Sequence, residues 1–345
     1  MNGLKKKINY KASIVIPTIH DFKKFKLLVD SIVLQKRVDF NTLEINIVSN
    51  NPKNSFERDF KYYFLKYKKL KIKYFFEKRI GLHYARHKGI SNSSSEIVIL
   101  LDDDVTLTRY YVCNAIKEFK ENKKLSVMGG PNILPNNIVL PKWIKKFFFE
   151  IKSKKKKICS YLSYLYLGDK KIIIEPKYIF GMNMCFRKSV YYELGGFHPD
   201  LIGKNNDNIF IGDGETGFLS KIKKANYLAI YNPKLKVYHR IEKSRLNLDY
   251  FLSRSTYRGY GFSFTRLKSN PSLLRAFFYI FVVIMVLLKN YFLFYYLRFF
   301  KKDLFRSMYK ILPNIFFFRS VFIHHFNYFF NKELRLWIAK PNYFN

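Results

Sequence analysis

Residues 96–104 read Glu-Ile-Val-Ile-Leu-Leu-Asp-Asp-Asp, a short apolar run that ends in three consecutive carboxylates. An uninterrupted apolar run of this length is typical of a buried strand, so we expect the acids where the strand leaves the core. Adjacent negative charges repel one another, and the chain has only 25 acidic residues against 63 basic ones. Mg²⁺ and Mn²⁺ favour such clustered carboxylates and often share them with substrate phosphates. The run therefore predicts a metal site, and the alternative is that Asp104 caps a helix over 105–122.

The segments around this run alternate between strand and helix patterns. The expected strands cover 12–16, 43–47, 71–76 and 96–101, and the expected helices cover 21–35 and 81–94. Such alternation indicates βαβ units, and thus a mostly parallel sheet with flanking helices. Ligands of these sheets bind beyond the carboxyl ends of the strands, which is where the three acids are expected.

The second half of the chain carries a glycine-rich segment, Gly-Asp-Gly-Glu-Thr-Gly at 212–217. It matches the GxGxxG pattern, but a dinucleotide fingerprint should open the first βαβ unit, and this segment lies two-thirds along the chain. We interpret it instead as the start of a helix that ends near Ala225. Ordered structure is expected over 178–186, and further strands are expected at 227–231 and 236–239.

Composition limits the class of protein. With 345 residues, 48% of them hydrophobic, the chain can bury a core and cannot be wholly disordered. The net charge of +38 favours anionic partners, although part of it is compositional because lysine is abundant throughout. Three widely spaced cysteines without a CxxC pair indicate a reducing compartment. Lys5 to Lys7 precede only a short apolar stretch that ends at Pro17, which predicts a first strand and not a signal peptide.

Two regions suggest contact with a membrane. Basic and aromatic residues interleave over 143–166, as suits an anionic interface or a solvated loop with a few buried aromatics. Residues 276–288 are strongly apolar but too few to span a bilayer, which takes about 20 residues. We therefore expect an interfacial or half-buried hairpin anchored by Arg275, Lys289 and Arg298. The alternatives are a single span over 276–297 and a buried helical subdomain.

Two single residues carry candidate chemistry. Glu215 lies in a small-residue turn at the start of a helix, where a carboxylate could accept a proton from a hydroxyl. The alternative for Glu215 is an acid that complements the helix dipole. His239 ends an alternating strand, and its imidazole could complete an oxygen-rich metal site.

The segment before the acids is basic. Arg79 and Arg86 lie around a helix start, where guanidinium groups and backbone N–H groups together suit a pyrophosphate. His83 and His87 have i, i+4 spacing but lack the glutamate of a zinc protease. We interpret these two histidines as helix-surface residues.

These motifs, taken in order, resemble the family 2 glycosyltransferases, which have a GT-A-type fold. The resemblance covers residues 12–240. The matching segments are Ser13–Thr18, Gly81–Ile90, Leu100–Val105 with the DxD pattern, Gly181–Arg187, Leu194–Phe197, Glu215–Leu219 and Val237–His239. The sequence departs from the family in having Ser49 where an aspartate usually reads the nucleobase, and in having a single acid, after Gly214, in the base motif.

The resemblance implies a GT-A-type, Rossmann-like domain over 1–245, with a nucleotide-sugar half over 1–130 and an acceptor half over 131–245. Residues 246–345 are expected to form a helical, membrane-associated region. The implied reaction is inverting transfer from a nucleotide diphosphate sugar to a hydroxyl of a glycan or lipid-linked acceptor, assisted by Mg²⁺ or Mn²⁺. The expected location is cytoplasmic, at the anionic inner face of the cell membrane, without a nucleic-acid partner.

The resemblance also assigns roles to residues. The implied catalytic base is Glu215, and the implied metal ligands are Asp104, Asp102 and His239. The residues expected to bind the donor are Pro17, Thr18, Ser49, Asn50, Arg79, Arg86, Asp102 and Asp103. The residues expected on the acceptor side are Gly181, Asn183, Asp213 and Gly214.

Three other classes of protein compete with this reading. A non-catalytic membrane- or polysaccharide-binding protein could keep the fold, because the base motif has one acid. A nucleic-acid-binding protein would explain the charge, but the charge is spread along the chain and no recognised motif appears. A nucleotidyltransferase would need a glycine-rich phosphate loop near the N-terminus, and residues 17–20 do not supply one.

Overall fold

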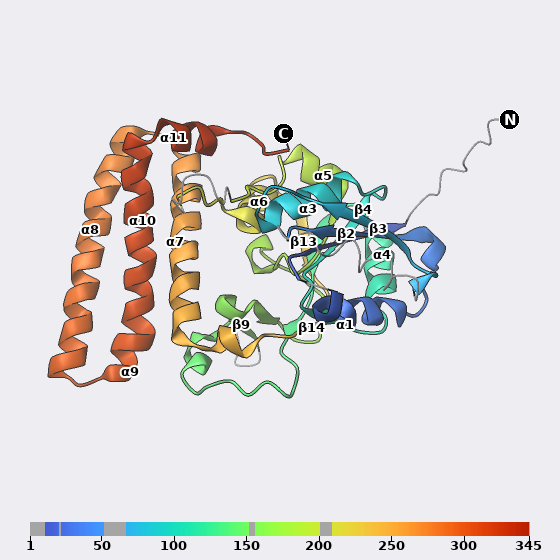
Figure 1. Ribbon diagram of the computed structural model, residues 1–345, viewed down its shortest axis with the longest axis horizontal. Coiled ribbons are helices and arrows are strands. Elements are labelled where there is room, and N and C mark those ends of the chain that lie inside the picture. The colour runs from blue at the N-terminus through green and yellow to red at the C-terminus, as the bar shows by residue number, and fades with distance from the viewer. Residues whose placement is uncertain (1–10, 21, 52–66, 152–155, 201–208, 345) are drawn as a thin grey trace.

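The computed structural model describes residues 11–20, 22–51, 67–151, 156–200 and 209–344. Within them, a mixed α/β unit lies beside a row of long helices formed by the C-terminal part of the chain (Figure 1). The basic residues Lys5 to Lys7, the expected helix start at Asp21 and the lysines at 154 and 155 fall outside the described residues.

The α/β unit is built on an eight-stranded sheet that is mostly parallel, as predicted. The four strands β4, β1, β2 and β3, which reach from the middle of the sheet to one edge, are parallel to one another. Next to them, β12 runs antiparallel between β4 and β6. The strands in spatial order are β11 (Ile172–Ile173), β13 (Leu228–Tyr231), β6 (Leu125–Gly129), β12 (Asn183–Arg187), β4 (Ile97–Leu101), β1 (Ala12–Thr18), β2 (Leu43–Ser49) and β3 (Lys71–Phe76).

The run that ends in the three acids is the central strand β4, and it is buried on both faces. Ile97, Ile99 and Leu101 join one core cluster, and Val98 and Leu100 join the other. Because successive side chains of a strand point to opposite faces, only an uninterrupted apolar run fits here. The first cluster also holds α1 (Phe22–Val33) and α4 (Tyr111–Glu121), and the second holds α3 (Leu82–Ser91), α5 (Lys188–Glu193) and α6 (Gly214–Lys224).

A second, six-stranded sheet joins the segment after the acids to the late histidine. In it, His239 of β14 is paired with Val105 of β5, the residue that follows Asp104. Its strands in order are β5 (Val105–Leu107), β14 (Val237–His239), β7 (Asn132–Ile133), β10 (Tyr164–Tyr166), β9 (Lys157–Cys159) and β8 (Phe149–Glu150). The pairing brings two predicted site residues together although 135 positions separate them in the chain.

The structure decides two points that the sequence left open. Asp104 does not cap a helix over 105–122, because β5 follows it directly and α4 begins only at Tyr111. In the ordered segment expected over 178–186, the strand begins at Asn183, because Pro176 opens a short 3₁₀ turn in which the Ile179 N–H donates to the Pro176 carbonyl.

The C-terminal helices are α7 (Leu248–Ser269), α8 (Leu273–Tyr295), α9 (Leu304–Arg306), α10 (Leu312–Phe330) and α11 (Lys332–Ala339). Helix α10 packs between α7 and α8, so three long helices stand side by side next to the α/β unit (Figure 1). The expected hairpin at Lys289 does not form. Lysine is a good helix former, and the Asn290 side chain donates to the Val286 carbonyl of its own helix, so the chain continues to Phe300 before it turns.

The helical segment Leu273–Phe300 is long and apolar enough to cross a membrane by length and composition. Only 6% of its most apolar stretch is buried, and one side of the helix is exposed, which excludes the alternative of a buried core helix. By contrast, aromatic residues of the 143–166 region are in the core. Trp143, Phe147 and Tyr161 pack against Phe251 of α7, and the Tyr161 and Phe251 rings are stacked with centroids 4.8 Å apart.

Candidate active site

A cavity of about 710 Å³ lies at the carboxyl ends of β1 and β4. It is walled by the end of β1, the start of α3, the three acids, the end of β14 and the first turns of α7. The predicted site residues that line it are Pro17, Thr18, Asn50, Arg86, Asp102, Asp103, Asp104, Glu215 and His239. The fold thus brings together side chains from both halves of the α/β unit, as parallel strands that end at one edge of a sheet require.

A buried guanidinium ties the acids to the glutamate. Arg86 is 1% exposed, its Nη2 donates to Asp102 Oδ1 at 2.8 Å, and its Nη1 donates to Glu215 Oε2 at 3.0 Å. His83 Nε2 lies 2.8 Å from the same Glu215 oxygen. Burial disfavours the charged guanidinium, but the charges of Asp102 and Glu215 hold the pKa of Arg86 above its ordinary value. Arg86 is therefore a permanent cation between two carboxylates, and both of its amino nitrogens are already engaged.

Glu215 is held as a carboxylate. Burial raises its pKa, but the Arg86 charge and the hydrogen bond with His83 outweigh burial and bring the pKa well below its ordinary value. The side chain is about a third exposed and faces the cavity. A carboxylate held this tightly is a weak base, and its basicity rises when Arg86 or His83 moves away.

Asp104 and His239 face each other at the other side of the acid triplet. His239 Nε2 lies 3.3 Å from Asp104 Oδ2, and Arg245 Nη1 donates to the same oxygen at 3.0 Å. Burial raises the pKa of Asp104, but the adjacent His239 and the positive charges of Arg245 and Arg240 hold that pKa below its ordinary value. His239 Nδ1 lies 3.0 Å from the Leu162 carbonyl, which can only accept, so Nδ1 carries the proton.

This tautomer matters for metal binding. With Nδ1 protonated, Nε2 of a neutral His239 ring is an acceptor beside Asp104 Oδ2, and Arg245 Nη1 lies 3.0 Å from that oxygen and 3.5 Å from Nε2. Asp104 Oδ1 is also buried and has no hydrogen-bond partner among the described residues. A buried carboxylate oxygen without a partner, beside an imidazole acceptor, is stabilised by a cation.

Asp103 lies between these two groups. The hydroxyl of Thr18 donates to Asp103 Oδ2 at 2.5 Å, which joins the ends of β1 and β4. Burial and the charges of Asp104 and Asp102 raise the pKa of Asp103 to about 7, although the Thr18 hydrogen bond opposes this.

Asn50 shapes the cavity through the backbone. Its Nδ2 donates to the carbonyls of Glu77 and Arg79 at 2.7 Å, and its Oδ1 accepts from the Gly81 N–H at 2.7 Å. Ser49 and Arg79 are not among the described residues that line the cavity; Ser49 is buried at the end of β2, and Arg79 forms an ion pair with Glu77.

The two glycines predicted on the acceptor side make room for the charged cluster. A Cβ at Gly181 would lie 2.7 Å from Arg86 Nη1, and a Cβ at Gly214 would lie 2.4 Å from the His83 ring. Gly214 also has φ +51°, which L side chains rarely adopt. The glycines of the 212–217 segment thus serve close packing around Glu215.

The other two acceptor-side predictions are engaged in structural hydrogen bonds. Asn183 is buried, accepts from the Tyr111 hydroxyl and donates to Asn132 Oδ1 at 2.8 Å. Asp213 Oδ1 lies 2.5 Å from His198 Nδ1, and the Asp213 side chain is 4% exposed. Neither is among the described residues that line the cavity.

The interpretation of His83 and His87 as helix-surface residues was wrong. Both are buried, because α3 is covered on this side by the segment around Phe197. His87 Nε2 lies 3.0 Å from the Phe197 carbonyl and Nδ1 lies 2.6 Å from the Tyr191 hydroxyl, while His83 contacts Glu215.

Sequence reasoning missed the wall that α7 contributes. The residues of α7 that line the cavity are Tyr250, Ser253, Arg254 and Tyr257. Their spacing of three, one and three positions puts them on one face of a helix, a signal that was available in the sequence. Arg245, which neutralises Asp104, was also missed, since no local pattern marks it.

The predicted set of three metal ligands is not assembled in this structure. Asp102 is turned to Arg86, whereas Asp104 and His239 face each other. Consistently, the described residues contain no group of three His, Cys, Asp or Glu side chains arranged around a metal position.

Comparisons with known proteins agree with this architecture. The family model described as glycosyl transferase family 2 matches residues 13–195. The glucosyl-dolichyl phosphate glucuronosyltransferase of Haloferax volcanii is 21% identical over 188 residues, which are 52% of this chain and 54% of that protein. The chain thus spans about half the length of this curated relative.

Among solved structures, the mannosyltransferase PcManGT from Pyrobaculum calidifontis, in complex with GDP-Man and Mn²⁺, has a TM-score of 0.51 with this chain. The two are 16% identical, and the alignment covers 74% of this chain and 66% of that one. At this identity the likeness shows a shared GT-A fold. Since the family model matches more than half of the chain, the protein belongs to glycosyl transferase family 2.

Proposed function

We propose that the protein transfers a sugar from a nucleotide diphosphate sugar to an acceptor hydroxyl, with inversion at the anomeric carbon and with the help of a divalent cation. The observation that carries this proposal is the cavity itself. In it, Glu215 and the Asp104–His239 pair are connected through the acid triplet and the buried Arg86. A base and a cation site in one cavity are what displacement of a nucleotide diphosphate by a hydroxyl requires.

Asp104 and His239 are the residues that fit the cation. The unsatisfied Asp104 Oδ1 and the Nε2 lone pair of His239 supply one oxygen and one nitrogen ligand. A nitrogen ligand favours Mn²⁺ over Mg²⁺, which prefers oxygen. When bound, the cation would neutralise charge that develops on the leaving diphosphate. Asp102, engaged by Arg86, is assigned to the donor and not to the cation.

Glu215 is proposed as the general base. It would take the proton of the acceptor hydroxyl as that oxygen attacks the anomeric carbon and the bond to the diphosphate breaks. A single carboxylate that only accepts this proton is consistent with one displacement and therefore with inversion. Arg86 and His83 orient Glu215, and Arg86 also links it to Asp102 at the donor side.

For the acceptor, we propose a lipid-linked phosphate carrier. The Nε of Arg254 on α7 is buried and has no hydrogen-bond partner among the described residues, and the side chain lines the cavity. A guanidinium there can bind an acceptor phosphate. Helix α7 packs on α10, which packs on the exposed apolar helix α8, so the cavity wall continues into a membrane-binding surface. The name of the Haloferax relative also specifies a dolichyl phosphate-linked substrate.

We further propose that α8 lies in the plane of the inner leaflet and does not cross the bilayer. The α/β unit stands beside the helix row and at the same height (Figure 1). An α8 that crossed the bilayer would carry this unit, with its exposed lysines, into the hydrocarbon. In this arrangement residues 1–245 act as the catalytic domain and residues 246–345 as the membrane-associated region.

The test starts from a screen of nucleotide sugars for thermal stabilisation with and without Mn²⁺, followed by transfer to lipid phosphate acceptors. With the donor so found, Glu215→Gln should reduce transfer at least about 100-fold, because it removes the base, and should keep donor binding within about twofold. The matched control is Glu121→Gln on the exposed surface of α4, which should transfer normally. A fully active Glu215→Gln enzyme would show that another group is the base.

A further inference from the structure

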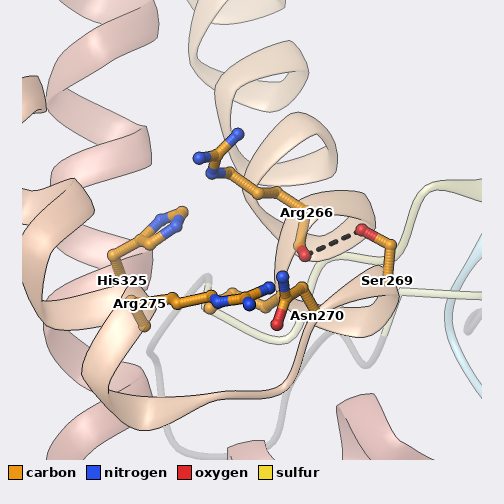
Figure 2. Close-up of a pocket in the computed structure, with 7 residues that line it drawn as sticks. Arg266, Ser269, Asn270, Arg275 and His325 are labelled. Carbon is orange, nitrogen blue, oxygen red and sulfur yellow. Dashed lines mark hydrogen bonds between the residues drawn. The ribbon is translucent and has the colours of Figure 1, made fainter.

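A second, smaller pocket lies between the helices and shares no residue with the active-site cavity. Its volume is about 180 Å³, and it is lined by residues from the end of α7, the start of α8 and the middle of α10. Figure 2 shows the polar side chains that gather there, which are Arg266, Ser269, Asn270, Arg275 and His325.

The pocket concentrates positive charge. Arg266 and Arg275 are both exposed, and neither forms an ion pair with a carboxylate within the part of the chain that the structure describes. The Arg266 guanidinium lies 3.6 Å from the centroid of the Tyr279 ring, so the stacked face is covered and the N–H edge is left for a ligand. The first turn of α8, capped by Ser272, adds the positive end of a helix dipole.

His325 supplies an independent sign of a ligand. The side chain is 0% exposed, and its Nδ1 contacts the Val321 carbonyl at 3.1 Å and the Ser263 hydroxyl at 2.8 Å. Its Nε2 is buried and lacks a hydrogen-bond partner among the described residues, although the residue lines the pocket. Because the Val321 carbonyl can only accept, Nδ1 carries the proton and Nε2 of the neutral ring is an acceptor. A buried acceptor without a partner is costly, and a ligand hydroxyl could satisfy it. The two guanidinium groups suit a phosphate group, and the imidazole beside them suits a hydroxyl of the same ligand, such as one of a phosphatidylglycerol headgroup.

The surroundings point to a lipid as the source of that phosphate. On α8, immediately beside Arg275, Leu274, Phe277 and Phe278 are 66%, 46% and 59% exposed. An acyl chain can lie against these side chains while its phosphate occupies the pocket, whereas a soluble phosphate would use none of this surface. We propose that the pocket binds the phosphate of an anionic lipid headgroup and thereby fixes the depth and orientation of α8 on the membrane.

This inference rests on the proposed membrane association of α8, and the test separates the two. Binding of the full chain is measured on phosphatidylcholine vesicles with and without phosphatidylglycerol. Arg266→Gln with Arg275→Gln should weaken binding to the phosphatidylglycerol vesicles about 25-fold, about fivefold for each arginine, and leave binding to pure phosphatidylcholine unchanged. The matched control is Lys123→Gln with Lys124→Gln, which removes the same charge from an exposed site beyond α4 and should change binding less than about twofold.

A second variant addresses the imidazole. His325→Phe keeps a ring but removes Nε2, and it should lower the preference for phosphatidylglycerol while its melting curve confirms the fold. If the arginine pair and the lysine pair lost the same amount of binding to phosphatidylglycerol vesicles, the attraction would come from diffuse charge. That result would overturn the proposal that the pocket binds a headgroup. Stabilisation by inorganic phosphate alone, abolished in the arginine pair, would assign the pocket to a soluble ligand instead.

A third variant checks the membrane proposal by itself. Phe278→Glu, Met285→Glu and Phe292→Glu lie on one exposed face of α8 and should together abolish binding to both kinds of vesicle. If they do not, α8 is not the membrane-binding surface, and the lipid assignment of the pocket fails with it. Donor turnover in detergent is measured in parallel, since a loss there would concern the proposed reaction and not the pocket.

Discussion

At the scale of single residues, the division of work among the three acids follows from their partners. Asp102 is bound by the permanent cation Arg86, Asp103 by the Thr18 hydroxyl, and Asp104 faces the lone pair of His239. Identical side chains in sequence thus have different electrostatic surroundings. Only Asp104 retains a buried oxygen without a hydrogen-bond partner among the described residues.

This difference leads to a prediction about the metal. Asp104→Ala should remove the Mn²⁺-dependent part of nucleotide affinity, a loss of at least about tenfold, because it deletes the oxygen ligand. Asp102→Asn should keep that Mn²⁺-dependent part, since its carboxylate serves Arg86. Titration calorimetry of the nucleotide diphosphate with Mn²⁺ and with EDTA measures both. If Asp102→Asn also lost the Mn²⁺ dependence, the set of three ligands expected from the sequence would be right.

The sequence predicted the acids at the end of β4 and Glu215 at the start of α6, because both positions follow from local patterns of apolar and small residues. It could not predict that Arg86 joins them. That contact spans 129 residues to Glu215, and it depends on the absence of a side chain at Gly181. The contact of Arg245 with Asp104 could not be predicted for the same reason, since the two residues are 141 positions apart.

At the scale of elements, β2 shows that alternation of apolar and polar residues predicts a strand but not which of its faces are buried. Leu43, Ile45 and Ile47 alternate with Glu44 and Asn46, which is typical of a strand with one solvated face. The strand is nevertheless buried on both faces, where Glu44 accepts hydrogen bonds and Asn46 Nδ2 donates to the Gly89 carbonyl and to Ser93 Oγ. Alternation alone does not tell whether a polar face meets water or hydrogen-bonding partners from a neighbouring element.

Glu44 allows a test of whether a buried polar residue of β2 stabilises the fold through its hydrogen bonds. It accepts hydrogen bonds from Ser13, Ser94 and Lys73, which join β1, β3 and the loop before β4. Burial raises its pKa, but these hydrogen bonds outweigh burial and lower the pKa below 4.5. Because the folded-state pKa is the lower one, the ionised group stabilises the fold at pH values above the unfolded pKa. That contribution is lost as the pH falls through the folded-state pKa.

Glu44→Gln should therefore destabilise the protein by about 1.5–3 kcal/mol at pH 7, and the difference from the parent protein should shrink below about pH 4. Urea unfolding at several pH values measures it. Glu150→Gln, at an exposed position on β8, is the matched control and should change stability by less than about 0.5 kcal/mol. A difference that stayed constant with pH would mean that packing, and not the charge of Glu44, is responsible.

At the scale of the whole molecule, the arrangement of the helices decides what the apolar segment can do. The sequence favoured a hairpin because Lys289 interrupts the apolar run, and it could not reveal that the segment continues as one exposed helix. The row formed by α7, α10 and α8, with the α/β unit beside it, is a property of packing that no local pattern contains (Figure 1). This row connects the cavity wall to the exposed apolar side of α8.

The proposed orientation predicts that both ends of α8 lie on the same side of the membrane. Single cysteines at Pro271→Cys and Lys301→Cys, before and after the apolar segment, are introduced with the part-exposed Cys113 replaced by serine. An impermeant maleimide should label both in inside-out vesicles and neither in right-side-out vesicles, because an α8 that lies in the inner leaflet exposes both ends to the cytoplasm. Labelling of one cysteine from each side would instead establish a spanning helix. In that case the α/β unit could not remain packed beside α7 as it does here, since its charged surface would have to enter the hydrocarbon.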